Sequence, residues 1–343
     1  MSVALVITFF VLLFPASAAD SFDPNSLSPI ANIFAPRSAP AQSVFEISML
    51  VLWICVGIFV IVGGLLLYTI IRFRRRRGDD GREPPQVYGS NQIELAWTVI
   101  PLLIVFVLVL VTARTIGEVQ NAVLPSDALR VTIVGHQWWW EIRYPSLGIV
   151  TANELHVPVS GPEKHMPTIL KLESADVVHS FWVPQLAGKT DVIPNRNNTM
   201  WIEPWQSGTY LGQCAEYCGT QHARMLLRVV VHSQEEFARW VTGQRQPVVN
   251  DPHVHTGRDL FQSTACMNCH TIGETVASGT FGPDLSHLMS RATLAAGAAA
   301  NTPENLRAWV RNPQQLKPGN LMPDMKLSEE ELDQLVAYLL TLR

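Results

Sequence analysis

The stretch from Cys214 to Met225 reads CAEYCGTQHARM and is unusually dense in metal-binding side chains. Two cysteines four residues apart, Cys214 and Cys218, are followed by His222 and then by Met225. Thiolate, imidazole and thioether form a soft ligand set, which selects copper over magnesium or calcium. A single tetrahedral zinc ion needs fewer donors, and thioethers are poor zinc ligands. The stretch therefore favours two copper ions that share both thiolates.

A site of this kind needs a second imidazole, and His179 in VVHSFWVP is the candidate because it lies among aromatic and apolar residues. The alternative is a disulfide between Cys214 and Cys218 in an exported domain, with His222 and Met225 nearby only by chance. The spacing C-x-E-x-C-x3-H-x2-M is too specific to favour that alternative.

With these residues the sequence resembles subunit II of the heme–copper cytochrome c oxidases. The resemblance implies that a dinuclear copper centre is bound by the side chains of His179, Cys214, Cys218, His222 and Met225. It also implies that Glu216 is a ligand through its backbone carbonyl, and that its carboxylate is associated with a magnesium ion at the contact with subunit I. Each of these positions matches the pattern of the family.

Length and composition are compatible with an electron carrier built from several domains. The 343 residues are enough for two or three domains, and a net charge of −4 gives no indication of nucleic-acid binding. Four of the five cysteines fall in two close pairs among other metal-ligand residues, which favours metal and heme chemistry over a disulfide scaffold. The fifth, Cys55, lies in an apolar run and is expected to be a small buried hydrophobic residue.

The N-terminus is expected to be a secretory signal over residues 1–19, because an apolar run at 2–14 precedes the small-residue string PASAAD. A positively charged start is missing, so an uncleaved membrane anchor is the alternative. Residues 20–44 are rich in proline, serine and alanine and are expected to form an extended arm.

Residues 45–114 are expected to form a transmembrane hairpin of two helices. The apolar runs Phe45–Ile71 and about Ile93–Thr112 can each cross a hydrocarbon core of about 30 Å at about 1.5 Å per residue. The loop between them holds six arginines, so the positive-inside rule predicts that it is cytoplasmic. Everything after Arg114 then lies on the periplasmic side of a bacterial inner membrane. Glu94 is either an interfacial anchor or, as the resemblance implies, the mouth of a proton channel shared with subunit I.

From about Leu129 the sequence changes to short β-branched and aromatic runs separated by proline and glycine, which predicts a sandwich or barrel. The resemblance implies a cupredoxin-like Greek-key barrel, which we expect over residues 115–243. Its last segment, 233–243, is expected to be a helix capped by Ser233 and Glu236 and ended by Gly243.

Three consecutive tryptophans, Trp138, Trp139 and Trp140, lie in the string GHQWWWEIRY. Successive side chains of a strand point to opposite faces, so one face should carry a large exposed ring, which needs a functional reason. The resemblance implies that Trp138 is the residue through which electrons enter toward copper.

A linker at 244–254 precedes a second signature, CMNCH, which is the heme c attachment motif. Cys266 and Cys269 would form thioethers to the porphyrin and His270 would bind the iron. A redox dithiol or half of a zinc site is the alternative. Residues 255–343 resemble an all-α class I cytochrome c, in which a carbonyl of the turn GPDL accepts a hydrogen bond from the iron-binding histidine. Met322 in a Met–Pro pair is favoured over Met325 as the sixth ligand.

These features predict a chain that moves electrons rather than one that transforms a substrate alone. The resemblance covers nearly all of residues 40–343 and implies a caa-type bacterial oxidase, in which electrons pass from heme c to copper and on to subunit I. Oxygen is reduced there and protons are pumped. The implied partners are subunits I and III and a cytochrome or other membrane-chain donor. The alternative is a membrane-anchored copper-delivery or electron-shuttle protein. A copper-delivery protein would need a thioredoxin-like fold, which the β-only pattern opposes.

Overall fold

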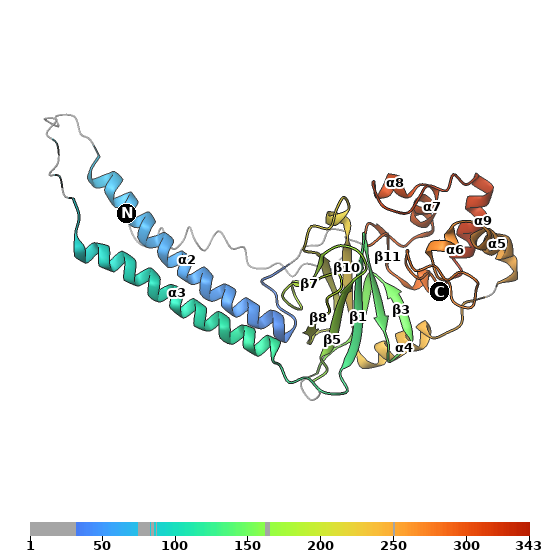
Figure 1. Ribbon diagram of the computed structural model, residues 1–343, viewed down its shortest axis with the longest axis horizontal. Coiled ribbons are helices and arrows are strands. Elements are labelled where there is room, and N and C mark those ends of the chain that lie inside the picture. Colours follow the sequence, from blue (N-terminus) through green and yellow to red (C-terminus); the bar gives the residue numbers. More distant parts are fainter. Residues whose placement is uncertain (1–31, 75–82, 84–85, 87, 162–164, 250) are drawn as a thin grey trace.

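The computed structural model describes residues 32–74, 83, 86, 88–161, 165–249 and 251–343. The expected signal peptide, the arm up to residue 31 and the arginines at 75–77 and 82 lie outside the described residues. The described chain has three parts in sequence order, namely a long helical hairpin, a β domain and a helical C-terminal domain that packs against the β domain (Figure 1).

The hairpin consists of α2 (Ala39–Arg72) and α3 (Asn91–Gln120), which lie side by side (Figure 1). Both helices are long and apolar enough to cross a membrane, and none of the most apolar window of either is buried within the chain. The helices extend beyond the predicted apolar runs. Residues 39–44 are helical, not part of an extended arm, and Pro40 is accommodated there because the first turn leaves its N–H groups unpaired.

Hydrogen bonds join the start of α2 and the end of α3 to the β domain. Ahead of α2, the Ser38 hydroxyl accepts a hydrogen bond of 2.8 Å from the backbone N–H of Glu203. At the end of α3, the Trp201 indole N–H donates to the carbonyl of Val119 at 2.8 Å. The end of α2 at Arg72 and the start of α3 at Asn91 therefore lie far from the β domain (Figure 1). This is the arrangement that the positive-inside rule requires.

The β domain is built from two five-stranded sheets. The first has the order β3 (Ile149–Ala152), β2 (Trp139–Tyr144), β1 (Leu129–His136), β5 (Thr168–Ser174) and β8 (Asn198–Ile202). The second has the order β4 (Glu154–Pro158), β10 (Leu226–His232), β9 (Gly208–Cys214), β6 (His179–Trp182) and β7 (Thr190–Val192). The pairs β1–β5 and β10–β4 are parallel and the others are antiparallel.

Alternation along these strands places apolar side chains from both sheets in one core. Trp140, Phe181 and Leu227 are among its fully buried members. This is the cupredoxin-like fold that was predicted. Helix α4 (Gln234–Gln244) follows β10 and begins with the predicted capping box of Ser233 and Glu236. It does not end at Gly243, since this glycine keeps helical geometry and the helix continues to Gln244.

The C-terminal domain starts with a short turn, η2 (Pro252–Val254), and α5 (His255–Ser263), which leads into α6 (Cys266–Cys269). A 3-10 turn, η3 (Leu288–Ser290), comes before a small hairpin of β11 (Thr293–Leu294) and β12 (Ala299–Ala300). Then follow α7 (Pro303–Arg311), α8 (Pro313–Leu316) and α9 (Glu329–Leu339). Thr302 caps α7 and Ser328 caps α9, and helices α5, α7 and α9 enclose a second apolar core.

Candidate copper and heme sites

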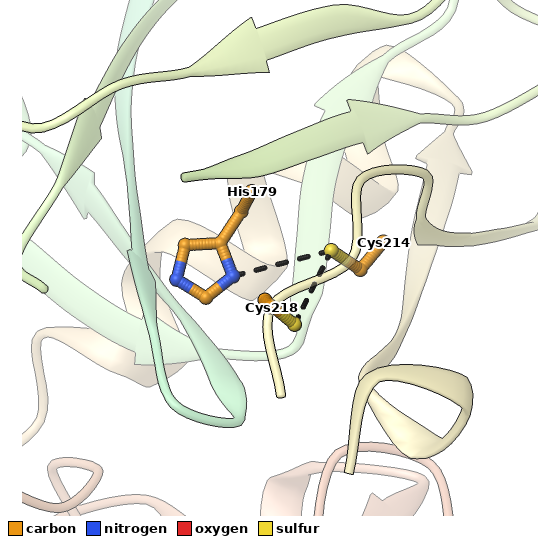
Figure 2. A group of neighbouring side chains, drawn as sticks. All are labelled: His179, Cys214 and Cys218. Carbon is orange, nitrogen blue, oxygen red and sulfur yellow. Dashed lines mark hydrogen bonds between the residues drawn. The ribbon is translucent and has the colours of Figure 1, made fainter. Parts of the chain in front are cut away.

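The first candidate site lies at one end of the second sheet, where three neighbouring strands bring its residues together. Cys214 is the last residue of β9, and its backbone N–H donates to the carbonyl of Met225 at 3.0 Å, just before β10 begins. The loop that connects them contains Cys218 and a 3-10 turn, η1 (His222–Arg224). His179 is the first residue of β6, the other neighbour of β9. Figure 2 shows its imidazole directed toward the two cysteines.

The five side chains proposed as ligands all gather around the two sulfur atoms. The Sγ atoms of Cys214 and Cys218 are 3.7 Å apart, and the Nδ1 of His179 is 3.9 Å from the Sγ of Cys214. The Sγ of Cys218 is 3.7 Å from the Nδ1 of His222 and 3.8 Å from the Sδ of Met225. A disulfide requires an S–S distance of about 2.05 Å, so the two cysteines are free thiols. The soft donors and their spacing fit a pair of copper ions.

The backbone carbonyl of Glu216 and its side chain lie in different surroundings. Its backbone carbonyl faces inward and lies 3.2 Å from the Sγ of Cys214. Glu216 as a whole residue is exposed to solvent. The carbonyl is therefore placed with the copper ligands, while the side chain remains free to meet another subunit.

Asp176 fixes the orientation of the His179 ring. Its carboxylate lies 2.8 Å from the Nε2 of His179 and accepts a hydrogen bond of 2.6 Å from the backbone N–H of Gln137. Burial raises the pKa of Asp176, but these hydrogen bonds outweigh burial and lower it overall. The carboxylate is thus ionised at neutral pH and leaves Nδ1 of His179 as the atom that faces the sulfurs.

The two thiols differ in pKa. The hydrogen bond between them lowers the pKa of Cys214, with a smaller contribution from His179, and together with burial it raises the pKa of Cys218. Cys214 is therefore the thiol that ionises more readily. Metal ions bind the thiolate form, so this arrangement favours metal loading.

Two of the three tryptophans, Trp138 and Trp139, lie between this site and the C-terminal domain. Trp138 is in the turn between β1 and β2, and its indole N–H donates to the carbonyl of Cys218 at 3.0 Å. Trp139 stacks on His136 with a centroid distance of 4.2 Å, and Trp140 lies in the core against Phe181. The expectation of an exposed ring is wrong. Trp138 and Trp139 are each only 9% exposed, because the C-terminal domain covers the face on which an exposed ring was expected.

The second candidate site is a cavity of about 1410 Å³, including its open mouth, that lies between the two domains. Cys266, Cys269 and His270 line it, and so do Trp138 and Trp139 from the β domain. The Nδ1 of His270 is 2.8 Å from the carbonyl of Pro283, as the resemblance implied. Gly282 packs on the His270 ring, where an added Cβ would lie 2.5 Å from Cε1. The ring is therefore held with Nδ1 occupied and Nε2 left for iron.

Met322 and Met325 both line this cavity, so the preference for Met322 stays a prediction. Arg291 also lines it and was not predicted. This arginine is buried, and among the described residues its Nε has no hydrogen-bond partner. A buried guanidinium with a spare donor fits an anionic group such as a heme propionate. A lone arginine in a loop gives no sequence signal that separates it from a solvated charge.

Glu94 lies apart from both sites, in the first turn of α3 at the end of the hairpin that is far from the β domain. It is exposed in the isolated chain, and its carboxylate turns back toward Gly89. The chain thus places it at the membrane end opposite to the copper ligands.

Comparison with known proteins gives three family-model matches. The transmembrane domain of cytochrome c oxidase subunit II matches residues 28–114, its periplasmic domain matches 151–233, and cytochrome c matches 254–343. Cytochrome c oxidase subunit 2 of Alkalihalophilus pseudofirmus is 33% identical over 315 residues, or 90% of each chain. The same-named protein of Bacillus subtilis is 30% identical over 331 residues, or 91% of each chain.

Among solved structures, the periplasmic domain of cytochrome oxidase subunit II from Bradyrhizobium japonicum is 30% identical. It covers 36% of this chain and 97% of its own, with a TM-score of 0.33. The matches to whole relatives extend over the hairpin, the β domain and the C-terminal domain alike.

Proposed function

The chain belongs to the cytochrome c oxidase subunit II family, and on that basis we propose which residues carry electrons through it. A subunit of this type with a cytochrome c domain belongs to a heme–copper terminal oxidase and carries copper in its β domain and heme c in its C-terminal domain. The observation that carries our assignment is the convergence of five soft donors, two of them free thiols, beside a cavity that contains the CMNCH motif.

Copper would be held by the side chains of His179, Cys214, Cys218, His222 and Met225 and by the carbonyl of Glu216. A dinuclear copper centre supplies one-electron transfer at this place. The protein contributes a Cys214 thiol with a lowered pKa, a carboxylate at Asp176 that orients His179, and a Cys218 carbonyl that accepts a hydrogen bond from Trp138. Because His179 and Cys214 lie on adjacent strands of one sheet, they need little rearrangement when charge changes.

Heme c would be attached through Cys266 and Cys269 and bound at iron by His270 and Met322. The chain keeps His270 in a single orientation through the Pro283 carbonyl and the contact with Gly282. Arg291 would neutralise a propionate inside the cavity. Heme is the group for which a cavity with two free cysteines, a fixed imidazole and a buried guanidinium is suited.

Trp138 would be the entry point for electrons into the copper site. Its ring lines the cavity on one side, and its N–H bonds to the backbone of the ligand Cys218 on the other. It is therefore in contact with both carriers. Electrons would enter at heme c, cross at Trp138, reach copper and continue to subunit I.

The remaining assignments concern the assembled oxidase. Glu94 would lie at the mouth of a proton channel shared with subunit I, and the Glu216 carboxylate would share a magnesium ion with that subunit. Subunit III and a cytochrome or other membrane-chain donor would be further partners. The hairpin would lie in a bacterial inner membrane with both electron carriers on the periplasmic side, which the separation of the hairpin turn from the β domain supports.

A copper-delivery or shuttle function is less well supported. A copper-delivery protein would carry its C-x3-C pair on a thioredoxin-like fold, whereas here the pair lies on a two-sheet β domain with a methionine beside it. Neither a delivery protein nor a simple shuttle needs an attached cytochrome domain that matches over residues 254–343.

The test is EPR and optical spectroscopy of the full chain, produced with heme c attached and loaded with copper. We expect a multi-line signal from one electron shared by two copper ions, together with a low-spin heme c spectrum. Cys218→Ser should abolish the copper signal and leave the heme spectrum intact. The matched control is Cys55→Ser in α2, which should change neither spectrum. A mononuclear copper signal in the unchanged chain would overturn the assignment.

A further inference from the structure

The small hairpin β11–β12 of the C-terminal domain is seated on the β domain. Its turn is tight, with Ala295, Ala296 and Gly297 all in the left-handed region at φ of 52°, 58° and 83°. The turn pushes Ala296 into a buried contact with Trp139 and Ala152. The carbonyl of Ala296 accepts a hydrogen bond of 3.2 Å from the backbone N–H of Leu226, next to the copper ligand Met225.

From the β domain, Glu154 forms hydrogen bonds with the residues at the start of this hairpin. It is only 2% exposed and comes directly before the core residue Leu155 on β4. Its carboxylate accepts hydrogen bonds from the N–H groups of Ala292 and Thr293, both at 2.9 Å, and from the Thr293 hydroxyl at 3.0 Å. Within the described chain, every hydrogen bond found for this carboxylate comes from the C-terminal domain. Loss of this carboxylate would leave the N–H of the buried Thr293 without this partner, which is costly, so Glu154 favours the docked domain.

Lys317 makes the reciprocal contact from the C-terminal domain. Its side chain is buried, and its ammonium donates to the carbonyl of Trp138 at 2.9 Å and to that of Ala295 at 3.2 Å. It therefore joins the docking hairpin to the turn that carries the proposed electron-entry residue. The buried carboxylate of Glu154 and the buried amine of Lys317 thus each have a hydrogen-bond partner across the contact.

We propose that Glu154 and Lys317 are positioning residues that hold the C-terminal domain docked, so that heme c and the copper site exchange electrons across one fixed contact at Trp138 and Trp139. This inference rests on the proposed function. The transfer moves one electron from heme c to the copper pair, and no bond or proton changes place. Docking removes the search that a separate cytochrome would need before each transfer.

The experiment compares the full chain with Glu154→Ala, after rapid photoreduction of heme c by a ruthenium dye. We expect the rate of electron transfer from heme c to copper to fall at least tenfold and to become dependent on solvent viscosity. The EPR signal of copper and the optical spectrum of heme should stay unchanged. In hydrogen–deuterium exchange, which needs no electron transfer, the amides of Ala292 and Thr293 should lose protection.

The matched control is Glu235→Gln, an exposed glutamate on α4, which should leave both rate and exchange unchanged. A second variant approaches the contact from the other domain. In Gly297→Val a Cβ would lie 2.9 Å from the Cβ of Leu226, and the φ of 83° disfavours valine. It should slow transfer to the same extent, and the two changes together should slow it no further.

The outcomes are separable. If Glu154→Ala disturbs the copper signal, Gly297→Val supplies the answer, because it leaves the β domain unaltered. A transfer rate within twofold of the unchanged chain in the variant with intact spectra would overturn the positioning role. Loss of the dinuclear signal or of heme c from the unchanged chain would instead count against the proposed function.

Discussion

Asp176 lies three residues before His179 and shows how a ligand is prepared by a neighbour that does not touch the metal. It accepts hydrogen bonds from the His179 ring and from the Gln137 backbone, and Gln137 in turn donates from its side chain to the Cys218 carbonyl at 2.8 Å. One carboxylate thus ties a copper ligand to the turn that carries Trp138.

We therefore predict that Asp176→Asn lowers copper affinity by about 10- to 100-fold, since loss of such an orienting partner typically has an effect of this size. The asparagine keeps the shape but not the charge that holds the His179 ring. Copper affinity can be measured by competition with a chelator of known strength. Asp127→Asn, at an exposed position before β1, is the control and should leave affinity unchanged. Equal affinities in all three proteins would show that the carboxylate has no orienting role.

Most of the candidate ligands stand out in the sequence because a metal site concentrates unusual side chains in a short string. His179, far away in sequence, was a candidate because it lies among aromatic and apolar residues, and β6 brings it to the site by pairing with β9. Arg291, Asp176 and Glu154 could not be predicted. Each is an ordinary charged residue whose role depends on which distant backbone groups the fold brings to it.

At the scale of elements, the crossing of α5 and α9 holds the C-terminal domain together. Gly257 in α5 lies against the backbone of α9, where an added Cβ would be 2.0 Å from the carbonyl oxygen of Gln334. Because the obstacle is backbone, no side chain can move aside to make room. The two helices can approach this closely only with glycine at this position.

Gly257→Ala should destabilise the C-terminal domain by at least about 2 kcal/mol, as expected for overpacking against backbone. Thermal unfolding followed by the absorbance of heme c is the measurement, and the copper signal should be unaffected at low temperature. Gly273→Ala is the matched control in the same domain, because its Cβ would meet the Ser286 hydroxyl at an ordinary 3.4 Å. An unchanged unfolding temperature for Gly257→Ala would mean that the crossing adapts.

Elements with strong local signals were predictable, and elements that depend on distant partners were not. The capping boxes of α4 and α9 and the apolar runs of the hairpin are written in consecutive residues. Strands β3, β4, β6 and β7 are only three to five residues long, and neither they nor the docking hairpin in ATLAAGAAAN has a strong local signal. An alanine-rich string carries no strand signal, and its pairing is stabilised by Glu154 and Leu226 from another domain.

At the scale of the whole molecule, the chain arranges its functions along one line. The helices α2 and α3, the β domain and the C-terminal domain follow one another in this order (Figure 1), and the cavity lies between the last two. The linker between the β domain and the C-terminal domain has a contact with each of them. The Arg245 side chain donates to the carbonyl of Leu147 at 2.9 Å, and Val248 packs on the apolar core of the C-terminal domain.

Two devices can keep the carriers together, namely the linker and the docking contact, and they predict different responses to added length. Suppose that the linker alone determined how often the C-terminal domain meets the copper site. Ten flexible residues inserted between Pro247 and Val248 would then lower the effective concentration of the domain and slow electron transfer. If the contact holds the domain, the inserted chain loops out and the carriers stay in place, at an entropic cost that grows only slowly with length.

We predict that the insertion alone changes the rate of transfer from heme c to copper by less than about threefold. In the Glu154→Ala background the same insertion should slow transfer further, and more so as the insert lengthens, because the chain must then rely on diffusion of a tethered domain. Flash photoreduction at several insert lengths measures both series. A tenfold loss from the insertion alone would assign the alignment of the carriers to the linker, whereas a flat series with Glu154 and a falling one without it would assign alignment to the contact.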